Sequence, residues 1–132
     1  MWQGSYRPRE RIVWLDVGIH GPLGARWYNF VLDTGSPVTV VDPGVVDELG
    51  YGAAMGKAIR TFWSIGGSQA GYSLDVQCLE VMGLLLEQCE VVCQDLPREL
   101  GVDGLIGMDL LEGHVLTLDG VGGHLRRHHI DS

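Results

Sequence analysis

Short apolar runs, separated by turn-forming segments, follow one another along most of the chain. Runs of about 4–8 residues that are rich in valine, isoleucine and aromatic side chains are typical of β-strands. The 20 glycines follow no collagen-like period, and glycine at this density indicates many turns rather than long helices. The pattern therefore predicts an all-β fold. Its strands are expected at residues 11–18, 26–33, 38–41, 59–64, 72–79, 84–93 and 114–118.

Two pairs of these strands are joined by segments that favour turns. Residues 20–24, with the sequence His-Gly-Pro-Leu-Gly, predict a hairpin between the first two strands. Residues 65–71 contain three glycines and predict the tip of a second, longer hairpin.

Helix signals occur at two places in the chain. Asp42 is a favourable N-cap and the proline after it suits the first helical position. Gly50 can end a helix, so residues 43–49 are predicted to form a helix of two turns. A second short helix is expected at residues 108–112.

Length and charge limit the classes of protein that the chain can represent. The 132 residues suit one domain, predicted to occupy residues 1–132 with its core at about residues 11–125 and short tails at both ends. A formal net charge of −8 disfavours nucleic acid and anionic membranes as partners. No apolar run reaches the roughly 20 residues of a membrane helix, and residues 1–10 lack the apolar stretch of a signal peptide. We therefore expect a cytoplasmic protein without nucleic-acid or membrane partners.

The cysteines offer a candidate metal site that the spacing does not favour. Cys78, Cys89 and Cys93 are odd in number, which is typical of reduced thiols rather than a disulfide framework. A metal site built from them with a histidine would be the alternative, but the close Cys-x-x-Cys pair of zinc knuckles is absent. Their apolar neighbours alternate along the chain and favour strand positions in the core. We expect no metal and no cofactor.

One acidic residue directly follows an apolar segment of the chain. Asp33 ends the run Phe30-Val-Leu and is followed by Thr34, Gly35 and Ser36. No lysine or arginine lies next to it in sequence, and a buried carboxylate without a counter-ion is costly. Such a carboxylate suggests a functional site. The alternative is an aspartate that only caps a turn, and an isolated Asp-Thr-Gly tripeptide does not decide between the two.

Two segments together resemble hallmarks of the retropepsin-like, single-lobe aspartic proteases. Asp33-Thr-Gly-Ser, with Thr39 and two following valines, resembles the active-site loop of that family. Residues 105–111, Leu-Ile-Gly-Met-Asp-Leu-Leu, resemble its second hallmark, in which two apolar residues and a glycine open the short C-terminal helix.

A third segment lies between these two in the chain. Ile65, Gly66 and Gly67 resemble the tip of the flap, the hairpin that covers the substrate, and Trp63 beside them is a candidate to line the substrate groove. The whole resemblance extends over about residues 11–125 and is closest to the cellular and bacterial members. It implies a closed, mostly antiparallel retropepsin-like lobe with one or two short helices, which assembles as a homodimer.

The chemistry of this family needs two carboxylates. Peptide hydrolysis without a metal requires a base to activate water and an acid to protonate the departing group. Two carboxylates about 3 Å apart share one proton and supply both, which confines activity to mildly acidic to near-neutral pH. The chain contains one Asp-Thr-Gly, so the second carboxylate is expected from Asp33 of another copy. By the resemblance, Thr34 joins the two loops across the dimer and Gly35 admits the substrate backbone.

The expected function is hydrolysis of peptide bonds by an aspartic endopeptidase that binds peptide or protein substrates. A non-catalytic peptide-binding or dimerisation module with the same lobe is the alternative. Pro37 and Met108 occupy positions where retroviral members often carry an acidic residue and an arginine that pair. Residues 2–11 and 125–132 do not obviously form the interleaved terminal sheet of retroviral dimers, and the histidines at 128 and 129 are expected to lie in a mobile tail.

Overall fold

The computed structural model describes residues 1–64 and 67–129, with the backbone alone at residues 9, 60, 62–64 and 67–69. The helical elements within these ranges are α1 (Pro43–Glu48) and the 3₁₀ turns η1 (Pro8–Glu10), η2 (Ala53–Met55), η3 (Arg98–Leu100) and η4 (Met108–Leu111). None of these helices is long and apolar enough to cross a membrane. The strands are β1 (Trp2–Ser5), β2 (Trp14–Gly21), β3 (Gly24–Leu32), β4 (Val40–Val41), β5 (Ala58–Ser64), β6 (Gly67–Val81), β7 (Leu84–Cys93), β8 (Gly104–Ile106), β9 (His114–Asp119) and β10 (His124–His129).

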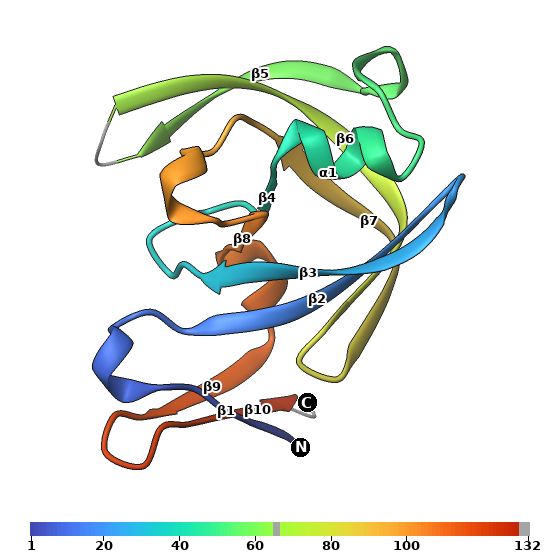
Figure 1. Cartoon of the computed structure of the whole chain (residues 1–132). Helices are drawn as coiled ribbons and strands as arrows, with labels where there is room; N and C mark the ends of the chain where they lie inside the picture. The colour runs from blue at the N-terminus through green and yellow to red at the C-terminus, as the bar shows by residue number, and fades with distance from the viewer. Residues whose placement is uncertain (65–66, 130–132) are drawn as a thin grey trace.

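Six of the strands form a closed barrel (Figure 1). They follow one another in the order β2-β3-β8-β4-β7-β6, and the pairing of β6 with β2 closes the ring. The pairs β3–β8 and β4–β7 are parallel, whereas the other pairs of the barrel are antiparallel. The predicted all-β, mostly antiparallel lobe with few helices is confirmed.

The barrel interior is filled by side chains from alternate strand positions. Val17 and Ile19 of β2, Phe30 of β3 and Val76 of β6 are completely buried. Because successive side chains of a strand point to opposite faces, the residues between them face outward. This period of two explains why the apolar runs in the sequence predicted the barrel strands other than β8.

The predicted hairpins are both present, but the second is longer than expected. β2 and β3 are joined at Gly21–Gly24, and β5 pairs with β6 from Ala58↔Ser73 to Ser64↔Gly67. Strand β6 therefore begins at Gly67, not at residue 72. The glycine at position 71 was interpreted as part of the turn, yet a Cβ there would lie 2.7 Å from the carbonyl oxygen of Cys93, so it marks close contact between strands.

The helix signals were correct. The side chain of Asp42 accepts a hydrogen bond of 2.9 Å from the backbone N–H of Gly44, as expected of an N-cap. Gly50 follows the helix with a φ of +92°, a conformation that suits glycine. Helix α1 packs Val45 and Val46 into the barrel core.

The ends of the chain form a second sheet, so the expectation of terminal tails is wrong. β1 and β9 flank β10, with Trp2 opposite Arg127. Leu125 and Arg127 are buried, and Arg127 donates from Nε to the carbonyl oxygen of Met82 at 2.9 Å. Buried and exposed positions alternate along β10, but one of the buried residues is an arginine. The pattern of apolar residues in the sequence therefore did not predict this strand. The histidines at 128 and 129 belong to β10 and not to a mobile tail.

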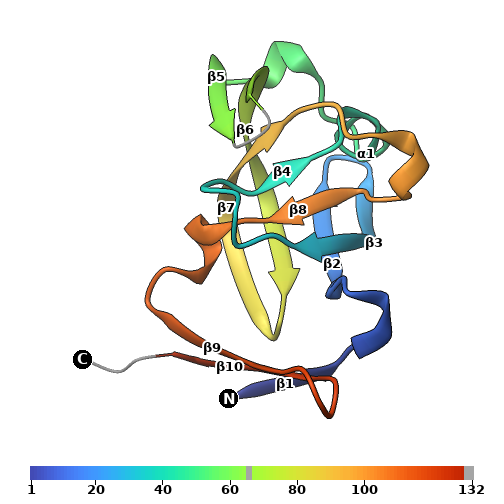
Figure 2. The ribbon, with the colours of Figure 1, turned by 90° about the vertical axis from the view of Figure 1, so that its left-hand side faces the viewer.

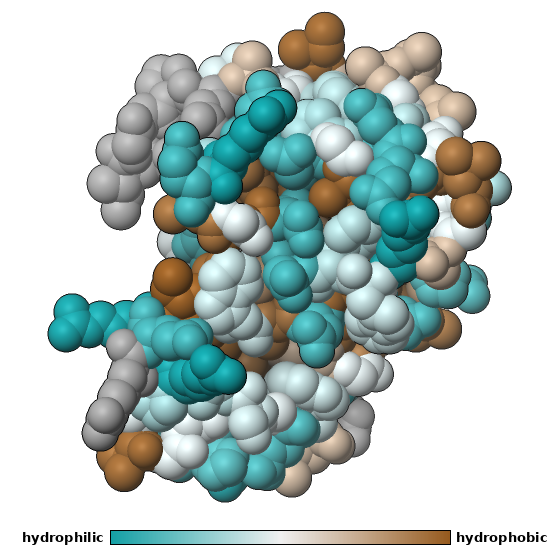
Figure 3. Space-filling view, viewed as in Figure 1, coloured by the Kyte–Doolittle hydropathy of each residue, from teal (hydrophilic) through white to brown (hydrophobic). Residues whose placement is uncertain are grey.

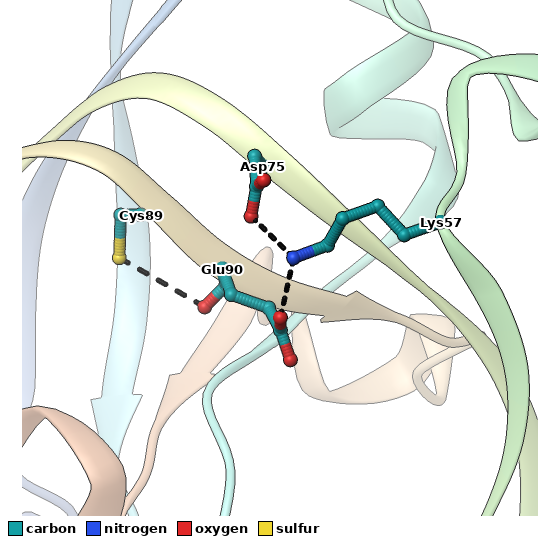
Figure 4. A network of polar contacts seen from close by, with 4 residues as sticks. All are labelled: Lys57, Asp75, Cys89 and Glu90. Atoms are coloured by element: carbon teal, nitrogen blue, oxygen red, sulfur yellow. Dashed lines mark hydrogen bonds and ion pairs between the residues drawn. The ribbon is translucent and has the colours of Figure 1, made fainter.

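An ion-pair network joins the base of the β5–β6 hairpin to the barrel (Figure 4). The ammonium group of Lys57 lies 2.8 Å from Asp75 Oδ1 and 2.5 Å from Glu90 Oε2. Hydrogen bonds to these two carboxylates raise the pKa of Lys57 above its ordinary value. Since the three residues precede β5 and lie on β6 and β7, the network fixes where the hairpin leaves the barrel.

Candidate active site

The loop that follows β3 folds around the side chain of Asp33. The Asp33 N–H donates to the carbonyl oxygen of Ile106 at 2.9 Å, which continues the pairing of β3 with β8 past the end of the strand. The N–H of Gly35 donates to Asp33 Oδ1 at 3.0 Å and that of Ser36 to the Asp33 carbonyl at 3.1 Å. The Gly35 N–H thus orients the carboxylate, while the Ser36 N–H holds the main chain of the turn.

The second hallmark segment packs directly against this loop. The N–H of Met108 donates to the carbonyl oxygen of Ser36 at 2.8 Å, and the Ser36 hydroxyl donates to the carbonyl of Val38 at 2.7 Å. Gly107 faces the backbone of residues 36–38 so closely that a Cβ would lie 2.9 Å from the Ser36 carbonyl oxygen and nearer still to that of Val38. The two motifs recognised in the sequence therefore form one unit.

A buried threonine and an aspartate connect the two motifs by side-chain hydrogen bonds. Thr39 is fully buried; its Oγ1 donates to Asp109 Oδ1 at 2.8 Å and accepts from the Gly107 N–H at 3.1 Å. The Thr39 N–H donates to Asp109 Oδ2 at 3.0 Å. Asp109 was not singled out from the sequence, because its role rests on contact with a residue 70 positions away. The only local feature that could have pointed to Asp109 is its position directly after the helix-opening glycine and Met108.

This connection makes Thr39→Val a sensitive test of how the loop is held. Valine has nearly the shape of threonine, so the change removes the hydroxyl and leaves the buried Gly107 N–H without its acceptor. We expect the free energy of unfolding to fall by about 1–3 kcal/mol, the cost of an unsatisfied buried donor. Chemical denaturation of the variant beside Thr61→Val, at an exposed strand position, measures it. Equal stability of the two variants would contradict this role.

The loop presents its outer surface to solvent. Asp33 is half-buried, whereas Thr34 and Gly35 are exposed. None of the ion pairs between described side chains involves Asp33. Figure 1 shows the loop on the same side of the lobe as the free end of the β5–β6 hairpin, and Figure 2 places it between that hairpin and the terminal sheet. The loop that carries Asp33 thus lies at the surface of the lobe.

The predicted flap tip is described only in part. Ile65 and Gly66 lie outside the described residues, and Gly67 is the first residue of β6, paired with Ser64 of β5. The side chain of Trp63, proposed to line the substrate groove, is also outside the described part. What the structure does describe is the hairpin that carries this tip.

The departures from the retroviral pattern leave no unpaired charge in the site. Pro37 is exposed and Met108 is about half exposed, at 48%. Both occupy the outer side of the unit formed by the two motifs. At Met108 the loop is held by the hydrogen bond from the Met108 N–H to the carbonyl oxygen of Ser36.

The cysteines have the core positions that the sequence predicted. Cys89 and Cys93 of β7 are buried and Cys78 is partly buried, all as free thiols. Burial raises the pKa of both Cys89 and Cys93 to about 11. These two thiols are therefore protonated near neutral pH and are poor nucleophiles or metal ligands.

A six-strand barrel that carries an Asp-Thr-Gly-Ser loop, braced by a glycine-opened turn, defines the class of single-lobe aspartic proteases. Residues 16–110 match the aspartyl protease family, and the chain belongs to that family. The fold is similar to the crystal structure of a retropepsin-like aspartic protease from Rickettsia conorii, with a TM-score of 0.67 at 16% sequence identity, over 95% of this chain and 98% of that one. Comparison with curated proteins gives no match. The retropepsin-like resemblance predicted from the three motifs is confirmed.

Proposed function

We propose that the chain is an aspartic endopeptidase whose active site forms when two copies bring their Asp33 carboxylates together. The observation that supports this proposal most is the arrangement of the Asp33 loop within a single chain. Its carboxylate is oriented by the Gly35 N–H and belongs to a loop with exposed residues, whereas the carboxylate of Asp109, in the adjoining motif, is occupied by hydrogen bonds from Thr39. One chain therefore supplies one reactive carboxylate, and a second chain is needed for the acid–base pair.

In the proposed dimer the two Asp33 side chains share a proton and hold a water between them. The ionised carboxylate removes a proton from that water as it attacks the peptide carbonyl, and the protonated one hydrogen-bonds to the developing oxyanion. The pair then delivers a proton to the leaving amine. Exposed Thr34 is placed to contact the partner loop, and Gly35 leaves room for the substrate backbone.

A two-chain active site makes activity depend on protein concentration. Below the dimer dissociation constant, specific activity is expected to rise in proportion to concentration, and above it to become constant. Cleavage of a denatured protein substrate, measured alongside sedimentation of the same samples, tests this. Activity that is constant down to concentrations at which the protein sediments as a monomer would exclude the shared site. A dimer that never cleaves would instead support the non-catalytic peptide-binding module.

We also propose that the hairpin of β5 and β6 is the flap, with Ile65, Gly66 and Gly67 at its tip. Its base is fixed to the barrel by Lys57, while its free end lies on the side of the Asp33 loop. Closure over an extended peptide would exclude water and supply backbone hydrogen-bond partners to the substrate.

The double variant Gly66→Val, Gly67→Val tests the flap. Two β-branched residues restrict the backbone that glycine leaves free, so we expect turnover to fall by at least about tenfold while the melting temperature changes little. Gly52→Val is the control, because a Cβ there meets nothing within 4 Å. If the double variant cleaves at the wild-type rate, the hairpin tip is not a flap, whatever the role of Asp33.

The free cysteines agree with a reducing compartment, and we propose a cytoplasmic location on that ground. The proposed partners are a second copy of the chain and a peptide or protein substrate.

A further inference from the structure

A groove lies between the terminal sheet and the barrel, apart from the Asp33 loop. It encloses about 750 Å³, within the usual range of ligand sites. Figure 3 shows hydrophobic residues at the base of the hollow between these two parts of the molecule. Its apolar and aromatic walls include Trp2, Trp14, Trp27, Met82, Leu85 and Leu125.

The groove arises because strands β2 and β6 diverge. They pair only from Gly18↔Glu80 to His20↔Cys78, so residues 14–17 of β2 remain paired with β3 but have no partner on β6. Strand β1 lies opposite and is an edge strand, since it is the outermost member of the terminal sheet. The wall formed by residues 4–6 therefore belongs to an edge strand, or directly follows it.

Three glycines shape the walls around the indole rings. A Cβ on Gly4 would lie 2.5 Å from the ring of Trp2, and one on Gly83 would lie 3.1 Å from the same side chain. A Cβ on Gly18 would lie 3.2 Å from the ring of Trp27. The absence of side chains at these positions lets the two indoles approach the backbone closely, and both rings belong to residues that line the groove.

The charged residues of the groove are all acidic. Asp16 and Glu80 are the charged side chains among its described lining, and no lysine or arginine is among them. Glu80 is oriented by His20, whose Nε2 lies 3.0 Å from Glu80 Oε1. Beside Glu80 stand the exposed side chains of Trp27 and Leu85, which are 66% and 60% accessible. Aromatic faces next to carboxylates attract cations that have an apolar stem.

We propose that this groove is a docking site for a basic, extended segment of a protein partner. Lysine or arginine stems would lie on Trp2 and Trp27, with their charged ends at Asp16 and Glu80. The outer edge of β1 favours a polypeptide over a free organic cation, because it offers backbone groups to an added strand. An exposed tryptophan and leucine beside carboxylates are typical of a recognition surface rather than of ordinary solvent-exposed surface.

The groove is independent of the proposed protease function. It lies at the end of β6 where that strand turns into β7, whereas the flap hairpin is at the other end of β6. Binding is therefore to be measured on Asp33→Asn protein, which cannot degrade the probe and so separates the two hypotheses.

The test uses a capped octapeptide of alternating lysine and valine, titrated at pH 7.5 in low salt and followed by calorimetry. We expect binding that Trp27→Ala weakens at least about tenfold and Trp27→Phe largely keeps. The pair Asp16→Asn, Glu80→Gln should weaken binding by a similar factor. Leu100→Ala is the control for loss of an exposed apolar side chain, and Asp95→Asn with Glu112→Gln is the control for charge.

Several outcomes would overturn the proposal. One is an unchanged dissociation constant in Trp27→Ala protein with a wild-type melting temperature. A second is equal weakening by the control charge pair, which would mean attraction to the net charge alone. Equally tight binding of a capped octapeptide of alternating glutamate and valine, or of tetramethylammonium, would exclude a basic peptide segment as the occupant.

Discussion

Replacing Asp33 with asparagine is expected to lower peptide cleavage by about 10³-fold or more while the protein keeps its fold. Asparagine has nearly the size of aspartate, and its amide oxygen can still accept the hydrogen bond from the Gly35 N–H. It cannot act as a base, and loss of general acid–base catalysis typically costs 10²–10⁴-fold. Rates on a denatured protein substrate, with circular dichroism and sedimentation of the same samples, measure the effect.

The matched control is Asp95→Asn, which changes an exposed carboxylate outside the site. It should cleave at the wild-type rate. Cleavage by Asp33→Asn protein above a few per cent of wild type would contradict the assignment of Asp33. The result would leave open the possibility of a second catalytic group, for which Asp109 would be examined first.

The same variant tests whether the carboxylates come from two chains. When an equal amount of Asp33→Asn protein is mixed with wild type above the dimer dissociation constant, random exchange converts about half of the wild-type chains into mixed dimers. If the pair is shared, these dimers are inactive, and the activity falls to about half. An unchanged rate after full exchange would mean that each chain carries a complete site.

The sequence predicted local features better than contacts between distant residues. Asp33 and the three residues after it form one short loop, whose internal hydrogen bonds join neighbours in the chain. The strands with alternating apolar residues and the cap at Asp42 were predictable for the same reason. The link from Thr39 to Asp109 was not, since it spans 70 positions and no local pattern marks either partner for the other.

Three strands were missed for two different reasons. β8 has three residues, and it exists because β3 and β4 flank it; alone it has no periodicity to detect. β1 and β10 are strands in which the less exposed positions include Gly4 and Arg127, which are not apolar side chains. The alternation of burial along them therefore did not appear as an alternation of hydropathy in the sequence. Propensity is a weak guide where tertiary contact decides the strand.

Glycine was the most misleading residue type. Its abundance was interpreted as a sign of turns, and Gly24, Gly50 and Gly83 do have positive φ angles. Gly71 and Gly104 instead stand within strands, where a Cβ would meet a backbone carbonyl or the ring of Phe30. At these two positions a larger residue is excluded because its Cβ would collide with neighbouring atoms, and not because the backbone has a positive φ angle. The same distinction decides the behaviour of Gly107.

Gly107→Ala is expected to destabilise the protein by about 3 kcal/mol or more, at the upper end of the cost of overpacking. Gly107 has φ −95° and ψ −178°, which any residue adopts, so backbone strain contributes nothing. A methyl group would instead collide with the backbone of Val38 and Ser36, which is held in place by Thr39 and Met108. The collision pushes apart the two segments that position Asp33.

Thermal and chemical denaturation measure this effect, with Gly52→Ala as the control. Gly52 has a φ of −155°, and a Cβ there meets nothing within 4 Å, so the same change should be neutral or slightly stabilising. For a chain of this length the expected loss at Gly107 corresponds to a melting temperature lower by about 10 °C or more. Cleavage should fall as well, even below the melting temperature, because the loop that carries Asp33 is displaced. A Gly107→Ala protein as stable and active as Gly52→Ala would show that the two motifs are not in the close contact described, and the account of how Asp33 is positioned would fail.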